Sequence, residues 1–444
     1  MSRVPRLPLD GVRIIDLTMV WAGPYATRLL ADMGADVIKV EGVSNPDLVR
    51  GIGGASQMAA GEQGWNRSAY FNEYNRGKRG MTLDLSQPEG QAALLELIDV
   101  ADALIENYRA DVLDGLGLGP EVLHARRPDL IIVSMPGFAK HGSERGMVGY
   151  GPTIEQMGGL VSLTGYEDGP AQKTGISYGD PVAGIMAAGA LVTALLRRQQ
   201  TGEGAVVEVS QRDNLVGLIG EAVMEWSMNR RVPPRRGNRH RWMVPHGCYP
   251  CRPLSEEEAR PVGMLGVASG FATDRWVTIA VATDEQWRTL CEVIGRPELG
   301  GDPRFAKAID RFEHQDAIDA IVREWTVERG DDEAAAMLQA RGVSAAAVRT
   351  PLTLTHDAHL AERGFYREVE HPTVGRHRVA GPLWNLSQPE VAIRSAAPCF
   401  GQHNGEVLSD LLGMTVEQIG RLEELVIVGD TPMAARPAAQ AIRR

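Results

Sequence analysis

The sequence predicts an α/β fold in which a largely parallel sheet is covered by helices on both faces. Short apolar stretches alternate with helical segments from the start of the chain, and this alternation of strand and helix is typical of βα units. Ligands of such sheets bind at the carboxyl ends of the strands. The predicted strands are residues 12–16, 36–41, 81–85, 103–107, 130–135 and 205–210, and the predicted helices between them are 23–33, 88–100, 182–198 and 211–228.

The length of 444 residues exceeds the usual size of one domain, and the composition changes abruptly after the helix that ends at residue 228. A basic, proline-containing stretch follows, and a second set of strand and helix patterns comes after it, including residues 276–281 and 308–328. We therefore expect a large Rossmann-like domain and a smaller α+β domain. The predicted divisions are 1–228 for the first part of the large domain, 229–245 for a linker, 246–350 for the small domain, 351–400 for a return linker and 401–444 for a C-terminal part that packs on the large domain.

The overall charge favours neither nucleic acid nor membrane as a partner. The formal net charge is −11, so any phosphate-binding site must depend on a local group of cations. The N-terminus lacks the apolar core of a signal peptide, no apolar run approaches the length that spans a bilayer, and there are four cysteines. We therefore expect a protein of the reducing cytoplasm.

Asp180 stands at the entrance of a helix rich in small residues, within the sequence Tyr178-Gly-Asp-Pro181. Proline suits the first helical position, so Asp180 is predicted to be the N-cap, and the residues alone favour a purely structural capping role. The same position also suits a nucleophile, because free N–H groups and the helix dipole hold a carboxylate ionised.

Three further segments resemble known cofactor-binding or phosphate-binding patterns or are irregular. Glu41 ends the second predicted strand, as does the residue that binds the ribose of a nicotinamide cofactor, but the turn after the first strand lacks the glycine fingerprint. The glycines at 115, 117 and 119 lie between two helical patterns, which favours a helix end and a turn. The segment 42–79 is predicted to be a long loop.

Two clusters could bind ions. Arg76, Lys78 and Arg79 lie within four residues and suit a phosphate or diphosphate as well as a solvated loop. Cys248 and Cys251 form a C-x-x-C pair, but no second ligand pair at matching spacing follows, so we predict reduced thiols and no metal site.

Taken together, six phrases resemble the family III CoA-transferases, which include formyl-CoA and carnitine CoA-transferases and are related to the α-methylacyl-CoA racemases. The resemblance is specific over residues 9–210 and loose over 246–444. The phrases are LDGVRIIDLT, AGPYATRLLADMGADVIKVE, NRGKRGMTLDL, ALIENYRADVLDGLGLG, GDPVAGIMAAGALVTALL and TGEGAVVEVS.

The resemblance makes Asp180 the nucleophile, because the catalytic aspartate of the family precedes this helix. It implies that Asp180 attacks an acyl-CoA to form a mixed anhydride, that CoA returns to give an aspartyl-CoA thioester, and that an acceptor acid reverses these steps. Backbone amides near Gly179 are the expected oxyanion donors. Coenzyme A is a substrate, and no metal or tightly bound cofactor is expected.

The resemblance also implies positions that contact CoA and an assembly. Lys78 and Arg79 match the expected phosphate contacts, Asn107 and Tyr108 match further CoA contacts, and Val20 lines the entrance. The family further implies a discontinuous large domain and a homodimer of two interlocked, ring-like subunits.

Departures from the family concern the acceptor. Trp21 stands where formyl-CoA transferases have a glutamine, and Arg239–Met243 replaces a run of glycines that covers their active site, so oxalate is a poor candidate. Met19 and Trp21 favour an apolar body, while Arg239 or Arg241 could pair with a second carboxylate. We expect a mid-sized organic acid, dicarboxylic or aromatic; equally, these arginines suit a solvated linker. Residues 253–273 resemble an insertion without an assigned role.

Three rival functions are compatible with parts of this sequence. An acyl-CoA racemase would use Asp180 with a histidine in residues 149–153, where this chain has Gly151-Pro152. A nicotinamide-dependent dehydrogenase is supported only by the βα opening and Glu41, and the absence of the glycine fingerprint weakens it. A non-catalytic CoA-binding protein is opposed only by the presence of Asp180.

Overall fold

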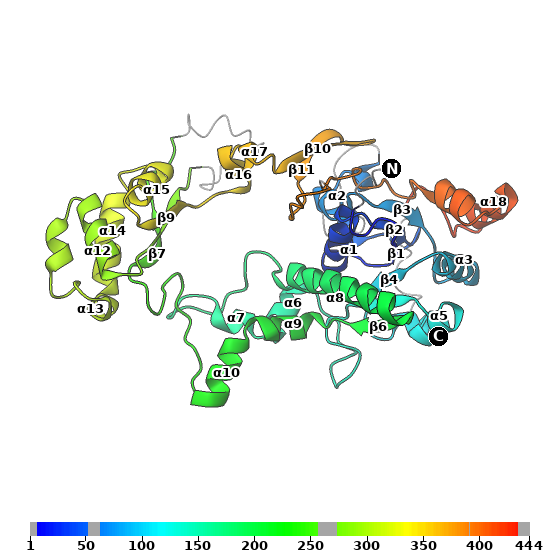
Figure 1. Cartoon of the computed structure of the whole chain (residues 1–444), viewed down its shortest axis with the longest axis horizontal. Coiled ribbons are helices and arrows are strands. Elements are labelled where there is room, and N and C mark those ends of the chain that lie inside the picture. Colours follow the sequence, from blue (N-terminus) through cyan, green and yellow to red (C-terminus); the bar gives the residue numbers. More distant parts are fainter. Residues whose placement is uncertain (1–6, 52–62, 256–272, 390, 434–444) are drawn as a thin grey trace. The chain divides into compact units, whose positions relative to one another are not determined.

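A computed structural model describes residues 7–51, 63–255, 273–389 and 391–433 (Figure 1). The chain forms two compact units, and each is discontinuous in sequence. The first comprises Met1–Ser162, Lys173–Pro233 and Gly364–Arg444, and the second comprises Leu163–Gln172 and Pro234–Arg363. Most of the insertion at 253–273 lies outside the described residues.

The first unit contains the parallel sheet that the sequence predicts. Its six strands lie in the order β3-β2-β1-β4-β5-β6, and every neighbouring pair is parallel. This is the order of Rossmann-type sheets, in which the chain changes direction across the sheet between β1 and β4. The strands are β1 (Arg13–Asp16), β2 (Asp36–Glu41), β3 (Arg79–Thr82), β4 (Ala103–Glu106), β5 (Ile131–Ser134) and β6 (Ala205–Glu208).

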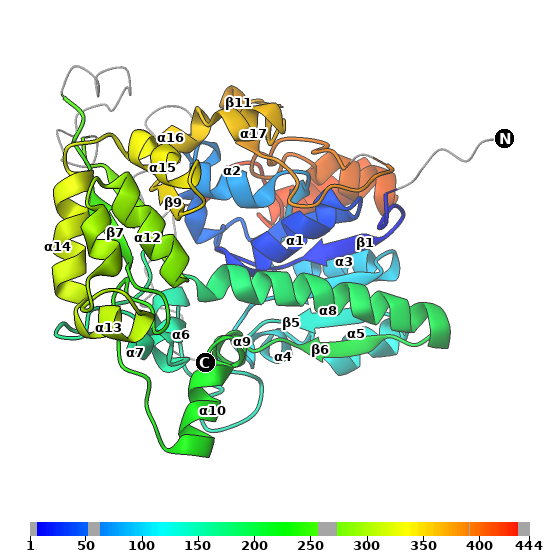
Figure 2. The same cartoon turned by 60° about the vertical axis from the view of Figure 1, so that its left-hand side comes forward.

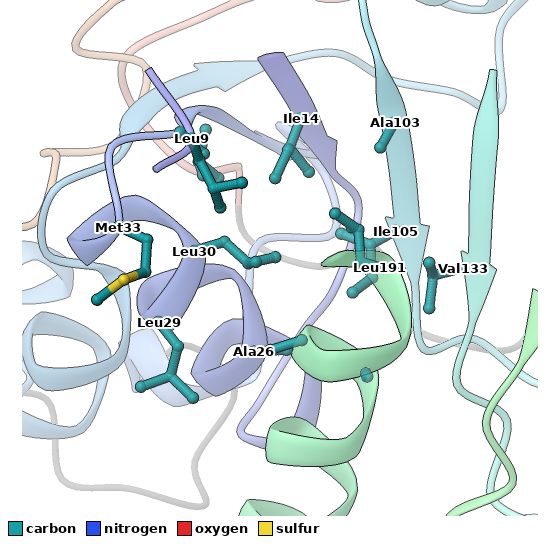
Figure 3. Close-up of a cluster of buried hydrophobic side chains, with 14 of the residues drawn as sticks. Leu9, Ile14, Ala26, Leu29, Leu30, Met33, Ala103, Ile105, Val133 and Leu191 are labelled. Atoms are coloured by element: carbon teal, nitrogen blue, oxygen red, sulfur yellow. The ribbon is translucent and has the colours of Figure 1, made fainter. Parts of the chain in front are cut away.

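Alternate strand residues face opposite sides of this sheet, and each side is covered by its own helices. Ile14, Ile105 and Val133 pack with α1 (Ala22–Asp32) and α8 (Gly179–Thr201) in one cluster (Figure 3). Their neighbours Ile15, Leu104 and Ile132 belong to the cluster on the other side, with residues of α3 (Pro88–Asp99), α5 (Pro120–Arg126), the π-helix Glu406–Leu411 and α18 (Val416–Glu424).

Helix α8 crosses α1 closely, and glycine permits the approach. A Cβ atom on Gly184 would lie 2.6 Å from the carbonyl oxygen of Ala22 and 3.0 Å from the ring of Tyr25. Among the described residues, α8 alone has the length and composition of a membrane-spanning helix, contrary to our expectation from sequence, but half of its apolar window is buried inside the protein. These are also the properties of a core helix.

Three sequence predictions of regular structure were wrong in detail. The segment 42–79 contains η1 (Leu48–Arg50), η2 (Gly64–Asn66) and α2 (Ala69–Asn75), so it is not one long loop. Two predicted helices are each divided, giving α9 (Gln211–Leu218) and α10 (Gly220–Asn229), and α13 (Ala308–Glu313) and α14 (Gln315–Thr326). Gly117 does lie in a turn, with φ of 69°, between α4 (Val112–Gly115) and α5, as predicted.

The second unit is built on an antiparallel sheet of three strands, β7 (His246–Pro250), β8 (Trp276–Ala280) and β9 (Ser344–Ala347), in the order β7-β8-β9. Helices α12 (Asp284–Val293), α14 and α15 (Asp331–Gln339) bury Trp287, Ile318 and Leu338 in one core with β8. Figure 2 shows these three helices around β7 and β9. The second unit also contains η5 (Pro297–Gly301), α16 (Pro351–Thr355) and α17 (Ala358–Glu362). The first unit contains α6 (Gly151–Met157) and a hairpin of β10 (Tyr366–His371) and β11 (Gly375–Ala380), and the chain passes from the first unit to the second within α7 (Leu160–Leu163).

Candidate active site

The turn after β1 meets the end of β4 at the point where the sheet changes direction. Asn107, the residue after β4, uses its side-chain amide to hold Met19 by both backbone groups: its Oδ1 accepts from Met19 N, and its Nδ2 donates to Met19 O, each at 2.8 Å. The structure therefore gives Asn107 a role in shaping the turn. Each amide atom can make one further hydrogen bond, so the predicted contact with CoA stays a prediction.

Val20 occupies a strained backbone conformation in this turn, with φ of +71°. A β-branched residue in the left-handed region is an outlier that costs about 1–2 kcal/mol. The Val20 N–H is held by Oδ1 of Asp47 at 3.0 Å, and Asp47 is itself paired with the buried ammonium of Lys39 at 2.9 Å. Such strain persists where the surroundings enforce it, which is common at functional sites.

Asp180 lies in the first turn of α8, almost fully buried. The helix begins at Gly179 with Tyr178 as its N-cap, so the prediction that Asp180 is the N-cap and Pro181 the first helical residue was wrong. The backbone N–H of Ala22, the first residue of α1, lies close enough to the Asp180 carboxyl group to lower its pKa. Two helix N-termini therefore converge on this one carboxyl group.

Burial raises the pKa of Asp180 to about 7, and the negative charge of Glu155 adds to the increase. Hydrogen bonds from the backbone of Ala22 and of Asp180 itself oppose this effect by lowering the pKa. The sequence predicted that the helix terminus would keep the carboxyl group ionised. The direction of that contribution is right, but burial outweighs it.

Gly151 contacts the same carboxyl group from α6. A Cβ atom on Gly151 would overlap Oδ2 of Asp180 and the side chain of Ser177. Residue 151 lies in the segment where a racemase would carry its histidine. A side chain there has no space in this structure, so the second base of a two-base racemase is missing from this position.

Aromatic side chains form a wall beside Asp180. Trp21, the N-cap of α1, lies with ring centroids 5.8 Å from Tyr70 and 5.4 Å from Tyr74. The charge of Asp180 contributes to the raised pKa values of both tyrosines, which shows that they lie within its electrostatic reach, although burial is the larger cause. The buried indole N–H of Trp21 has no hydrogen-bond partner. The wall thus supplies apolar surface and one free donor.

The cationic pair Lys78–Arg79 has structural partners instead of an open surface. Lys78 is 1% exposed, and its ammonium donates to Asp16 Oδ2 at 2.9 Å, Asn75 Oδ1 at 2.7 Å and Pro24 O at 3.1 Å. Arg79 starts β3 and therefore lies towards the amino edge of the sheet, where it pairs with Asp36 and Glu406. Neither cation lies where the sequence predicts a phosphate contact. Lys78 is buried among its own partners, and Arg79 lies at the edge opposite the carboxyl edge, where ligands are expected.

The other predicted positions are placed as follows. A Cβ atom on Gly179 would lie 2.9 Å from Leu215, so this glycine allows α9 to approach the start of α8. Tyr108 is partly buried at the end of β4, and burial raises its pKa. Both residues thus lie on the elements that form the site.

Arg239 and Arg241 lie in the second unit. Arg239 pairs with Asp316 at 2.5 Å and Asp319 at 2.7 Å, both from α14, so its charge is already matched. Arg241 is exposed and stacks over Trp242 at 4.6 Å. Arg239 also lines a cavity of about 990 Å³, but the mixed charges on its walls do not favour one ligand.

The C-x-x-C pair has no disulfide. Cys248 and Cys251 are free thiols, and burial raises the pKa of both, to about 12 for Cys251. Within the described part of the chain, no group of three or more His, Cys, Asp or Glu residues could hold a metal ion.

Comparison with known proteins decides the family. The model of CoA-transferase family III matches residues 9–254 and 265–404. The chain belongs to the family III CoA-transferases. As a member, it moves CoA between an acyl-CoA and a carboxylic acid.

Named relatives agree over most of the chain. It is 32% identical to the succinyl-CoA–D-citramalate CoA-transferase of Chloroflexus aurantiacus, over 95% of this chain and 98% of that one. It is 31% identical to the succinyl-CoA:mesaconate CoA-transferase of Haloarcula hispanica, with coverages of 90% and 96%. A formyl-CoA:oxalate CoA-transferase of Rhodopseudomonas palustris is 32% identical, with coverages of 94% and 96%.

Solved structures share the fold. A CaiB/BaiF family protein from Brucella suis superposes with a TM-score of 0.77 at 30% identity, over 91% of this chain and 100% of that one. A Mycobacterium tuberculosis protein, Rv3272, superposes with a TM-score of 0.72 at 27% identity, over 90% of this chain and 99% of that one.

Sequence reasoning missed the residues that surround Asp180 in space. Gly151, Glu155, Tyr70 and Tyr74 come from α6 and α2, far from residue 180 in the chain. Glu155 had no signal in the sequence, because a carboxylate in the mixed segment GPTIEQM is ordinarily expected at the surface. The tyrosines stood in a stretch that sequence reasoning took for a loop, so their common helix face was not seen.

Proposed function

We propose that Asp180 transfers CoA through covalent intermediates. A carboxylate oxygen of Asp180 attacks the donor thioester carbon, the C–S bond breaks and CoA leaves as a thiolate. The thiolate then attacks the carboxyl carbon of Asp180 in the mixed anhydride, which releases the donor acid and leaves an aspartyl-CoA thioester. The acceptor carboxylate repeats these steps in reverse. The convergence of two helix N-termini on a buried carboxyl group supports this role.

The turn before α1 completes the proposed machinery. Each tetrahedral step places negative charge on a carbonyl oxygen, and fixed N–H donors in a buried site stabilise that charge. The Ala22 amide already reaches the Asp180 carboxyl group, and the indole N–H of Trp21 is buried without a partner. We assign both donors, with the amide of Gly179, to the reacting oxygens.

We propose Arg109 as a cation for the phosphates of CoA. It directly follows Asn107 and Tyr108 at the carboxyl edge of the sheet, and it is exposed. This location replaces the one first predicted at Lys78 and Arg79, whose cations are paired inside the protein or at the opposite edge.

We propose a mid-sized dicarboxylic acid, such as a four- or five-carbon diacid, as one substrate. The relatives from Chloroflexus aurantiacus and Haloarcula hispanica carry succinyl-CoA in their names, which supports this choice. Trp21 and its tyrosine neighbours suit the apolar part of such an acid. Of the two arginines that the sequence suggests for a second carboxylate, Arg239 is already paired with Asp316 and Asp319, so Arg241 is the one left to test.

We propose that two copies form the interlocked homodimer of the family. Large apolar side chains are exposed on two helices of the first unit, and a second copy would cover them. They are Ile185, Met186 and Leu196 of α8, and Val223, Met224, Trp226 and Met228 of α10. Interlocked subunits cannot separate while folded, so two differently tagged preparations should stay unmixed until they are unfolded and refolded together; ready exchange would contradict interlocking.

An oxygen-isotope experiment tests the covalent route. In this mechanism one oxygen of the acceptor carboxylate remains on Asp180, and an Asp180 oxygen leaves with the donor acid of a later turnover. An acceptor labelled with oxygen-18 should therefore label Asp180 and then the released donor acid. Direct attack of the acceptor on the acyl-CoA would leave Asp180 unlabelled.

A further inference from the structure

Helix α6 presents two residues to the start of α8. Gly151 and Glu155 are four positions apart and therefore lie on the same helix face. Gly151 contacts the Asp180 carboxyl group, and Glu155 lies one turn further on, with a completely buried side chain.

Glu155 binds the segment from which α8 begins. Its carboxylate accepts the backbone N–H of Tyr178, the N-cap of α8. The hydroxyl of Thr174 lies 2.9 and 3.1 Å from its two oxygens. These contacts fix both the position and the direction of the first turn, which carries Asp180.

We propose that Glu155 is a positioning residue for Asp180, and that its negative charge sets the pH at which Asp180 becomes a nucleophile. This inference rests on the covalent role proposed for Asp180. It assigns a function to a buried carboxylate that the covalent reaction itself does not use.

The electrostatic surroundings support the second part of the inference. The titratable groups near Asp180 are Glu155 from α6 and the hydroxyls of Tyr70 and Tyr74 from α2, and among them the charge of Glu155 contributes to the raised pKa of Asp180. The described donors to Glu155 are a neutral amide and a neutral hydroxyl, so they do not cancel its charge. Two carboxylates in a buried site disfavour joint ionisation. A more basic carboxylate is also the stronger nucleophile once it is ionised.

The decisive variant is Glu155→Gln, which keeps a similar shape and a hydrogen-bond acceptor but loses the charge. Asp180 reacts as a carboxylate, so activity falls as the pH drops through its pKa. With the neighbouring charge removed, Asp180 should stay ionised at lower pH, and the acidic limb of kcat should move down by about one unit. If the acidic limb of the kcat profile stays in place and kcat falls equally at every pH, the charge of Glu155 does not act on Asp180 and its role is structural.

Two further variants separate position from charge. Glu155→Asp keeps the charge but shortens the reach to Tyr178, so kcat should fall severalfold while the acidic limb stays near that of the wild type. Full activity in Glu155→Asp would contradict the positioning role. Glu121→Gln on α5 removes one exposed charge and serves as the control, with an unchanged pH profile.

Adduct formation in the wild-type protein tests the covalent mechanism independently of the role of Glu155. Adduct formation on Asp180 in the wild type, together with an unmoved limb in Glu155→Gln, would overturn the inference alone. A wild-type protein that never forms the adduct would overturn the covalent mechanism itself.

Discussion

The carboxyl group of Asp180 lies directly against the Cα of Gly151, so close that a methyl group on Gly151 would overlap Oδ2. This contact joins two helices, α6 and α8, at the proposed nucleophile. It also leaves no space for a second catalytic base at residue 151. The contact therefore favours one-carboxylate acyl transfer over two-base proton transfer.

We expect Gly151→Ala to reduce kcat at least tenfold, because its methyl group must displace Asp180 or Ser177. Gly189→Ala on α8 is the matched control, since a methyl group there meets no neighbour within 4 Å. Steady-state kinetics of both variants would check this. Equal activity of the two would show that the contact at Gly151 does not constrain the nucleophile.

Replacing the nucleophile should abolish turnover without harming the fold. Asp180→Asn should lose at least about 10³-fold in kcat, because an amide is a far poorer nucleophile than a carboxylate. Its thermal stability, measured by calorimetry, should not fall. A joint loss of stability and activity would instead support a purely structural role for Asp180.

The raised pKa of Asp180 also predicts how stability depends on pH. The pKa of the carboxyl group is about 7 in the folded state and near its ordinary value of 3.8 in the unfolded state. Between these values the folded state binds more protons than the unfolded state, so this group destabilises the fold as the pH rises towards 7. The wild type should therefore gain stability relative to Asp180→Asn when the pH falls from 8 to 5. No change in this difference would show that Asp180 is ionised throughout.

The sequence predicted the sheet better than the site, and the reason is physical. Buried parallel strands are apolar and short, so β1, β2 and β4 were visible as local patterns. The parallel topology predicted that ligands bind at the carboxyl edge of the sheet. The resemblance to the family predicted that Asp180 is the nucleophile. The partners of Lys78 could not be predicted, because Asp16 lies 62 residues away in the chain and only the fold brings the two together. For the same reason, the cationic cluster looked like a ligand site.

Lys78 should therefore matter for stability more than for CoA. Lys78→Met leaves Asp16 without its closest cation inside the protein, and breaking a buried pair in this way costs about 3–5 kcal/mol. Denaturant unfolding would measure this loss. A stable Lys78→Met variant with a raised KM for acyl-CoA would restore the phosphate-binding role.

Arg109, in contrast to Lys78, should matter for CoA binding and not for stability. Arg109→Ala should raise the KM for acyl-CoA about tenfold, equivalent to about 1.4 kcal/mol, and should leave stability unchanged. Raising the salt concentration should weaken CoA binding less in the variant than in the wild type. Arg197→Ala is the control, because it removes an exposed positive charge at the far end of α8. It should change neither the KM for acyl-CoA nor the salt dependence of CoA binding.

The acceptor can be tested by charge reversal. Arg241→Glu should lower turnover of a dicarboxylic acid much more than that of a monocarboxylic acid of similar length, because only the diacid needs a second cation. Arg239→Glu should mainly destabilise the second unit, since it places a third negative charge beside Asp316 and Asp319. A small, uniform effect of Arg241→Glu on both acids would remove this residue from the substrate site.

The covalent role of Asp180 is tested most directly by mass spectrometry of the trapped protein. The protein is incubated with acyl-CoA alone and treated with borohydride or hydroxylamine, and its peptides are mapped. The mechanism predicts modification of Asp180 in the wild type, its absence in Asp180→Asn, and its loss when acceptor acid is added before trapping. A modification that maps to another residue, or turnover that persists in Asp180→Asn, would contradict it.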